Sequence, residues 1–246
     1  LLISMLKSRT ERQILYSLGL LQSARNFDFS AELLPLLEHP SAFVREEAVR
    51  TLHALPGNHE QALEPLLRDP SDGVRNAAVE YLCMHDPAGT REKLRELLDR
   101  PDPDIRLAAA RCAARQPETV FFPSMDLIHG LLGLVGSRKA EANEVAAQLA
   151  ARRPAVDSVP LLRRLMRDPN RRIAASAVAA AGRAGHTQLV PDILSLLSDP
   201  GLRPVSRKTL AAFGPKIVPF LAAALDDGNA EAAVRLEIPW ILGRLQ

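Results

Sequence analysis

Three side-chain types that bind zinc stand close together in the stretch CMHD, at Cys83, His85 and Asp86. Thiolate, imidazole and carboxylate groups are the common zinc ligands of proteins, and a closed site needs four of them. Ligands one to three residues apart at a helix end do not all face one ion unless a second cluster completes the set. No Cys-x-x-Cys pair, His-Glu-x-x-His sequence or glycine-rich phosphate loop is present. We therefore expect no metal site and interpret CMHD as a helix end that packs into the core.

The histidines give no better candidate for catalysis. An enzyme needs polar groups that converge on a reacting atom. The six histidines are scattered, and none has a serine or cysteine nucleophile directly beside it; they are His39, His53, His59, His85, His129 and His186. We predict no catalytic residue, no metal and no cofactor, and hence a protein that is not an enzyme.

A group of arginines between residues 152 and 172 has the right chemistry for phosphate. Its members are Arg152, Arg153, Arg163, Arg164, Arg167, Arg171 and Arg172. Guanidinium groups that neutralise phosphates would make binding to nucleic acid fall steeply with salt. A solvated arginine-rich helix face, or contact with a protein or another anionic surface, explains the same residues. The sequence leaves these alternatives open.

The elements that position these residues repeat along the chain. An apolar residue opens a similar helical pattern about every 30 residues, with one interval of 68; the positions are Val44, Val74, Ile105, Ile173, Val205 and Val234. A fixed period of this length indicates stacked supersecondary units. The long interval places a degenerate unit at 117–152, where Gly130, Gly133 and Gly136 favour a bend or hinge. Seven helical pairs then account for nearly the whole chain.

Each unit predicts a first helix with leucine pairs and a second helix with a buried stripe. Val74, Ala77, Ala78, Tyr81 and Leu82 show the stripe of the second helices, with the spacing i, i+3, i+4, i+7, i+8. Prolines mark the first helices. Pro160, Pro191 and Pro219 fit a first helical turn, whereas Pro35 and Pro65 predict shortened or kinked helices.

The turn between the two helices carries charged residues at fixed places. In RDPSDGVR, Asp69-Pro70 ends one helix, and Ser71 or Asp72 is expected to cap the next. Arginines follow the apolar anchor in four units, at Arg45, Arg75, Arg106 and Arg235. We expect them to form a ladder with aspartates of adjacent turns, the candidates being Asp69, Asp72 and Asp104.

These features resemble HEAT repeats, particularly the short bacterial kind also found in phycobilin-lyase-like proteins. The resemblance implies an all-α, right-handed α-solenoid of about seven HEAT-like helical pairs in one domain, 1–246. A helix at 1–24 precedes repeats at roughly 25–56, 57–86, 87–116, 117–152, 153–185, 186–214 and 215–246. HEAT arrays serve as scaffolds, adaptors, lyases and, in one HEAT-like branch, DNA glycosylases. Thus the resemblance predicts the fold more closely than the function.

Two short segments resemble a particular architecture. RQILYSLGLLQ at 12–22 and VRLEIPWILGRLQ at 234–246 are similar to the HEAT part of bacterial ADP/ATP-carrier-like membrane proteins that also carry a cyclic-nucleotide-binding module. The first residues lack an initiator methionine and a signal peptide, so we interpret the chain as an excised segment of a longer protein. No apolar run approaches the roughly 20 residues of a membrane-spanning helix. Two cysteines, Cys83 and Cys112, are expected to be buried thiols in a reducing cytoplasm.

The leading functional hypothesis is a noncatalytic scaffold that binds a protein partner or another domain of its own polypeptide. Polar residues beside the buried stripe are candidates for the contact surface, namely Arg50, Asn76, Glu80 and Arg111. Trp240, after the helix-disrupting Pro239, is either a partner-binding anchor or packs under a further repeat. The alternative is a nucleic-acid binder of the DNA-glycosylase kind that uses the arginines at 152–172, although the sequence lacks the aromatic residues such enzymes use.

Overall fold

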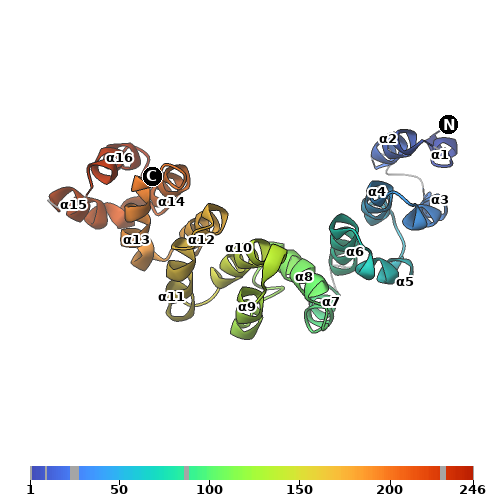
Figure 1. Cartoon of the computed structure of the whole chain (residues 1–246), viewed down its shortest axis with the longest axis horizontal. Coiled ribbons are helices and arrows are strands. Elements are labelled where there is room, and N and C mark those ends of the chain that lie inside the picture. Colours follow the sequence, from blue (N-terminus) through green and yellow to red (C-terminus); the bar gives the residue numbers. More distant parts are fainter. Residues whose placement is uncertain (1, 9, 23–27, 86–88, 228–230, 246) are drawn as a thin grey trace. The chain divides into compact units, whose positions relative to one another are not determined.

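The chain is built from paired helices (Figure 1). The computed structural model describes residues 2–8, 10–22, 28–85, 89–227 and 231–245, and these residues contain α-helices and 3-10 helices but no strand. The all-α solenoid fold expected from the sequence is thereby confirmed. Contacts divide the chain into two compact units, Leu1–Phe121 (unit 1) and Phe122–Gln246 (unit 2). The division lies within the degenerate repeat at 117–152.

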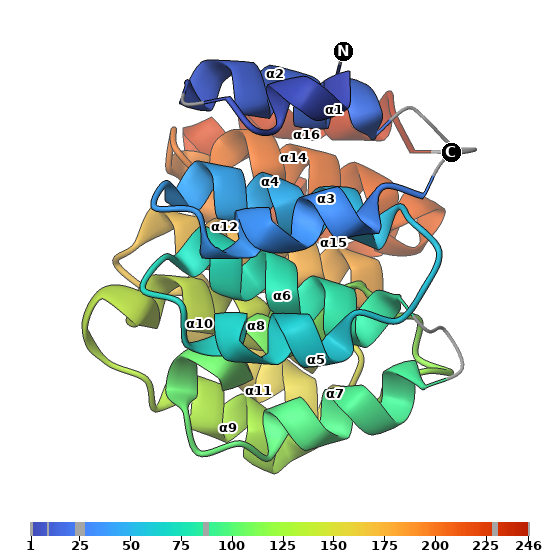
Figure 2. The same ribbon diagram turned by 90° about the vertical axis from the view of Figure 1, so that its right-hand side faces the viewer.

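Unit 1 begins with two helices and continues with three helical pairs. The first two helices are α1 (Leu2–Met5) and α2 (Glu11–Leu21). The pairs are α3 (Ser30–Leu33) and η1 (Leu34–Glu38) with α4 (Ala42–His53), α5 (Glu60–Leu63) and η2 (Glu64–Arg68) with α6 (Asp72–Met84), and α7 (Thr90–Leu98) with α8 (Pro103–Arg115). The second helices stack in order, because α4 packs on α6 and α6 packs on α8 (Figure 2).

Unit 2 contains four further pairs. They are α9 (Met125–Leu132) and η3 (Gly136–Arg138) with α10 (Lys139–Ala150), α11 (Ala155–Met166) with α12 (Arg171–Ala184), η4 (Thr187–Leu189), α13 (Val190–Ser195) and η5 (Leu196–Ser198) with α14 (Arg203–Ala212), and η6 (Gly214–Ile217) and α15 (Val218–Asp226) with α16 (Ala232–Leu242). Here too the second helices stack, α10 on α12 and α12 on α14.

Small residues let the second helices approach closely. Ala78, Ala109 and Ala177 occupy the same place in three repeats and are fully buried. Gly182 shows how close the approach is, because a Cβ atom built on it would lie 2.7 Å from Cγ2 of Thr209 on α14. Apolar burial at the interfaces between repeats therefore forms a continuous core along each unit.

The sixth repeat keeps the predicted register but buries its anchor less. Val205 is the third residue of α14, as the other anchors are of their second helices, and Thr209, four residues later, is 6% exposed. Val205 itself is only partly buried, whereas Leu202, directly before the helix, is 4% exposed. Leu202 therefore supplies buried apolar surface at the start of this helix.

Prolines shape the helices, partly as expected. In the first two repeats the α-helical turns of α3 and α5 change to 3-10 geometry at the residue before Pro35 and Pro65, which confirms the predicted shortening. Pro191 and Pro219 lie in the first turn of α13 and α15. Pro160 instead lies inside α11, which begins at Ala155, so its assignment to a first turn is wrong.

Helix α16 likewise continues through Pro239 to Leu242 and does not end early.

The turn chemistry also differs from the expectation. The Ser71 side chain forms no hydrogen bond to cap α6. Instead, the Asp69 carboxylate accepts the backbone N–H of Ser71 at 2.8 Å, across the proline. Asp199 accepts the N–H of Gly201 at 2.7 Å in the same way. The aspartate of the Asp-Pro pair thus fixes the turn.

No single helix within the described ranges is both long and apolar enough to cross a membrane. By length and composition alone, one broken pair passes the test, Arg203–Ala212 with Gly214–Asp226, which is bent by 113°.

Candidate partner-binding groove

The four side chains proposed from sequence as a contact surface lie together in unit 1. Arg50 on α4, Asn76 and Glu80 on α6, and Arg111 on α8 all line one groove of about 190 Å³. The residues that complete it are Glu46, Gly73, Ala77, Ala108, Cys112 and Arg115. The repeat explains this convergence, since Arg50, Glu80 and Arg111 occupy equivalent positions of three stacked second helices.

Charges of opposite sign alternate along the groove. Arg50 lies 2.5 Å from Glu46 and 3.6 Å from Glu47 on its own helix. Arg115 pairs with Glu80 across the repeat interface at 2.8 Å. Arg111 donates a hydrogen bond to the Asn76 side chain. The Arg50 and Arg115 side chains are 59% and 57% exposed, so their ion pairs are weak enough for a ligand to replace.

The floor of the groove is made of small residues. A Cβ atom at Gly73 would overlap the Glu46 carboxylate, so glycine leaves room for that side chain. Cys112 also lies at the floor and is 5% exposed. Cys83 and Cys112 are both buried free thiols, as predicted. The hydrogen bond with Cys112, together with burial, raises the pKa of Cys83, so this thiol stays protonated.

A second hollow of about 290 Å³ adjoins the first and shares Arg50, Ala77 and Glu80 with it. Its other lining residues are Val49, His53, Tyr81 and Met84. The surface offered to a ligand therefore changes along α6, from charged and amide groups to aromatic and thioether groups. Such a mixture of apolar area and few polar groups is typical of binding surfaces.

A cluster of aromatic rings supports the second hollow. His85 stacks on Tyr81 with ring centroids 4.4 Å apart, and the His53 ring lies 5.8 Å from Tyr81, edge to face. The Tyr81 hydroxyl accepts the His59 N–H at 3.1 Å and donates to the Gly57 carbonyl at 3.3 Å. Burial raises the pKa of Tyr81, and burial with the nearby His85 lowers the pKa of His53.

Sequence reasoning missed this cluster because its members come from different repeats. His53 ends α4, whereas Tyr81 and His85 lie at the end of α6. The four-residue spacing of Tyr81 and His85, which places both on one helix face, was the available signal. Asp86 of the CMHD stretch lies outside the described residues.

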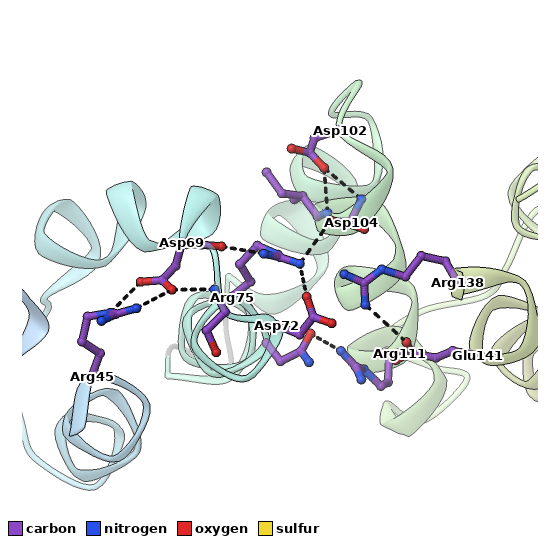
Figure 3. Close-up of polar contacts among 12 residues, drawn as sticks. Arg45, Asp69, Asp72, Arg75, Asp102, Asp104, Arg111, Arg138 and Glu141 are labelled. Carbon is purple, nitrogen blue, oxygen red and sulfur yellow. Dashed lines mark hydrogen bonds and ion pairs between the residues drawn. The ribbon is translucent and has the colours of Figure 1, made fainter. Parts of the chain in front are cut away.

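The arginine ladder is formed in the first two repeats (Figure 3). Arg45 donates to both Asp69 oxygens, from Nε at 2.7 Å and from Nη2 at 2.8 Å. Arg75 donates to the Asp69 carbonyl at 2.5 Å, to Asp104 at 3.1 Å and to Asp72. These bonds tie each second helix to the turns on either side.

The Arg45–Asp69 pair is charged in the folded protein. Burial opposes ionisation of Asp69, but hydrogen bonds from Arg45 and the Ser71 amide, with the charges of Arg45 and Arg75, outweigh it. The pKa of Asp69 is therefore lowered, and the Asp69 hydrogen bond raises the pKa of Arg45. Arg106 and Arg235 form no ion pair with described residues, so the predicted ladder does not extend to them.

The arginines at 152–172 are mostly engaged with carboxylates. Arg163 and Arg167 both pair with Asp192 of the next repeat, at 2.9 and 3.3 Å. Arg171 pairs with Asp199 at 3.3 Å and Arg172 with Glu144 at 3.1 Å. Within the described ranges Arg164 has no such partner. Much of the positive charge that suggested phosphate binding thus connects repeats.

Trp240 is partly buried between two arginines. The guanidinium carbons of Arg207 and Arg244 lie 4.0 and 3.9 Å from its ring centroid. Arg207 also pairs with Glu237 at 3.0 Å. Cation–π contacts on both sides leave little of the ring face for a partner. The tryptophan therefore joins α14 to α16, an explanation that the sequence did not suggest.

A comparison with protein families agrees with this geometry. Residues 60–120, which contain α5, η2, α6, α7 and α8, match the family model for HEAT repeats. This segment is similar to HEAT repeats. We call it the HEAT segment, and it includes most of the groove. No curated protein matches the chain.

Three solved structures are similar to this chain over nearly its whole length. An engineered protein shares 19% identity, with 99% of this chain and 77% of that chain covered and a TM-score of 0.46. The complex of CpcE and CpcF of phycocyanin lyase from Nostoc sp. shares 20% identity, with 98% and 93% covered and a TM-score of 0.48. Human deoxyhypusine hydroxylase in complex with glycerol shares 18% identity, with 99% and 94% covered and a TM-score of 0.40.

Among the described residues outside the HEAT segment, Ser158 and His186 have the types found in nucleophilic catalysis. The Ser158 Oγ lies 2.6 Å from Nε2 of His186. The serine is fully buried and also bonds to the Pro154 carbonyl at 3.1 Å. Burial lowers the pKa of His186. A substrate cannot reach a nucleophile without exposed surface, so this pair connects α11 to the next repeat. The described residues contain no group of three metal-ligating side chains.

Proposed function

We propose that this chain is a noncatalytic protein-interaction scaffold and that the unit 1 groove binds its partner. The observation that carries the proposal is the convergence of Arg50, Asn76, Glu80 and Arg111 on one exposed groove. The arginine ladder ties α4 and α6 to the adjacent turns and thereby fixes the spacing of the helices that line the groove. A solenoid suits this role because it offers a long surface of constant form.

The finer parts of the proposal concern the setting. The partner is another protein or another domain of the same polypeptide, as the resemblance to carrier-like bacterial proteins implies. Two free cysteines favour a reducing cytoplasmic location. Nucleic-acid binding by the 152–172 arginines is the weaker alternative, because five of them, including Arg153, are paired with carboxylates.

Site-specific photocrosslinking tests the groove. A benzophenone side chain at Met84, an exposed residue of the second hollow, is expected to capture the partner in cells. The same group at Arg95, an exposed residue of α7 outside both hollows, is the matched control. Charge reversal at Arg50 and Arg111 is expected to abolish capture from Met84. Equal capture from both positions, or capture that survives the reversal, would refute the groove as the binding site.

Salt-dependent retention tests the alternative. Duplex DNA that binds at low salt, and binds more weakly after Arg164→Ala and Arg172→Ala, would support nucleic-acid binding. We expect no retention.

A further inference from the structure

Helix α15 of unit 2 is almost wholly apolar yet buries little of its surface. Its sequence is VPFLAAALD, and Leu221 is its one buried residue. Val218 and Leu225 are 42% and 43% exposed. A helix on the surface of a soluble protein normally turns its apolar residues to the core and keeps polar residues outside. An exposed apolar face of this kind often marks an interaction site.

A groove of about 410 Å³ lies between α13 and α15. It is lined by a different side of α15 from the one that carries Val218 and Leu225. Its apolar lining consists of Pro191, Leu194, Phe220, Ala223, Ala224 and Val234. The groove belongs to the first helices of the last two repeats, apart from Val234 at the start of α16. Its residues are entirely different from those of the unit 1 groove.

The charge around this groove has one sign. Asp227 and Glu231 line it, and no lysine or arginine does among the described residues. Asp226, the last residue of α15, is also exposed. The groove therefore offers a hydrophobic floor and an acidic rim, and charge complementarity requires a ligand with basic flanks.

An amphipathic helix has the matching form. Its apolar residues recur at i, i+3, i+4 and i+7 and enter a groove as a single row, while basic residues flank the row. An anionic membrane is a poor match, because its surface would repel the acidic rim.

We propose that the groove between α13 and α15 binds a basic amphipathic helix of a partner protein. The apolar anchors pack on Leu194, Phe220 and Val234, and lysines or arginines of the helix pair with Glu231. The proposal does not depend on the unit 1 groove, so each surface can fail its test alone.

A synthetic peptide provides the probe. We choose a labelled helix of about 18 residues with leucines in the i, i+3, i+4, i+7 pattern and lysines on both flanks. Fluorescence anisotropy with the whole chain is expected to show saturable binding. A peptide with every lysine replaced by glutamate is expected to bind at least about tenfold more weakly.

Two alanines of α15 provide matched variants. Ala222 and Ala223 are both exposed, but only Ala223 lines the groove. Ala223→Arg is expected to weaken binding by about tenfold or more, because its side chain fills the groove and its positive charge repels a basic ligand. Ala222→Arg is expected to change binding by less than about twofold, which separates the groove from general effects of added charge. Glu231→Gln is expected to cause a smaller loss that diminishes at high salt.

Three results would overturn the proposal. The first is that the lysine peptide binds the Ala223→Arg protein as tightly as the unsubstituted protein, or that the glutamate peptide binds as tightly as the lysine peptide. The second is binding to phosphatidylcholine vesicles that Ala223→Arg removes, without peptide binding, which would identify a membrane contact. The third is a dimer in sedimentation that Ala223→Arg dissociates, without peptide binding, which would identify a second copy of the chain as the occupant.

Discussion

The two units use the same Asp-Pro turn but bury its ion pairs to different depths. In unit 1, the side chains of Arg45 and Asp69 are 12% and 5% exposed. In unit 2, the side chains of Arg171 and Asp199 are 68% and 31% exposed. Each pair joins a second helix to the turn of the following repeat. The difference therefore lies in solvent access and not in the residue types.

The comparison shows that one motif serves two purposes. Both aspartates accept a backbone N–H two residues on, so both fix their turn. Only Asp69 also holds a buried arginine. Breaking a buried pair leaves an uncompensated charge, whereas water replaces an exposed pair at little cost. In unit 1, the contacts between repeats thus depend strongly on the ion pairs of the ladder. In unit 2, they depend more on close packing of the helices than on ion pairs.

The largest effect is expected from Asp69→Ala. Loss of the carboxylate leaves the Arg45 guanidinium buried without its partner, and we expect the free energy of unfolding to fall by about 3 kcal/mol. Urea denaturation followed by circular dichroism measures the change. Asp199→Ala is the control, because it removes a turn aspartate of the same kind. Both variants lose the hydrogen bond that fixes the turn, and loss of the exposed Asp199 ion pair is expected to add less than about 1 kcal/mol to that cost. Equal losses in the two variants would contradict the comparison.

Glycine substitutions test close packing. Gly182→Ala adds a methyl group against Thr209, a buried β-branched side chain with little freedom to move, and the overpacking is expected to cost about 1 to 3 kcal/mol. Gly19→Ala on α2 meets nothing within 4 Å and is expected to stabilise by about 1 kcal/mol through helix propensity. Thermal unfolding compares the two. Stabilisation by Gly182→Ala would show that the interface between α12 and α14 accommodates an added methyl group without overpacking.

The smallest effect concerns pH. Burial lowers the pKa of His53 in unit 1 and of His186 in unit 2. The unfolded chain then binds more protons below pH about 6.5, so stability is expected to fall as the pH decreases from 7 to 5. His53→Asn and His186→Asn should each flatten this dependence, as measured by urea midpoints at several pH values. An unchanged slope in both variants would exclude these histidines as its source.

The repeat made part of this structure predictable. Arg50, Glu80 and Arg111 occupy equivalent positions, so counting residues from the anchor brings them together without any knowledge of the fold. The His53, Tyr81 and His85 cluster is different, because it depends on which ends of neighbouring helices meet. The errors have equally specific causes. Ser71 and Asp69 both have an oxygen that accepts a backbone N–H, so the sequence alone did not show which of them fixes the turn.

The position of Trp240 has a consequence for spectroscopy. It is the single tryptophan of the chain and lies in the last helical pair of unit 2. Intrinsic tryptophan fluorescence therefore reports the environment of α14 and α16 and is silent about unit 1, whereas circular dichroism reports both units. In the Asp69→Ala variant the two signals should separate, with ellipticity lost before fluorescence changes, if the units unfold independently. One indole ring thereby makes the cooperativity of the whole array measurable without any label.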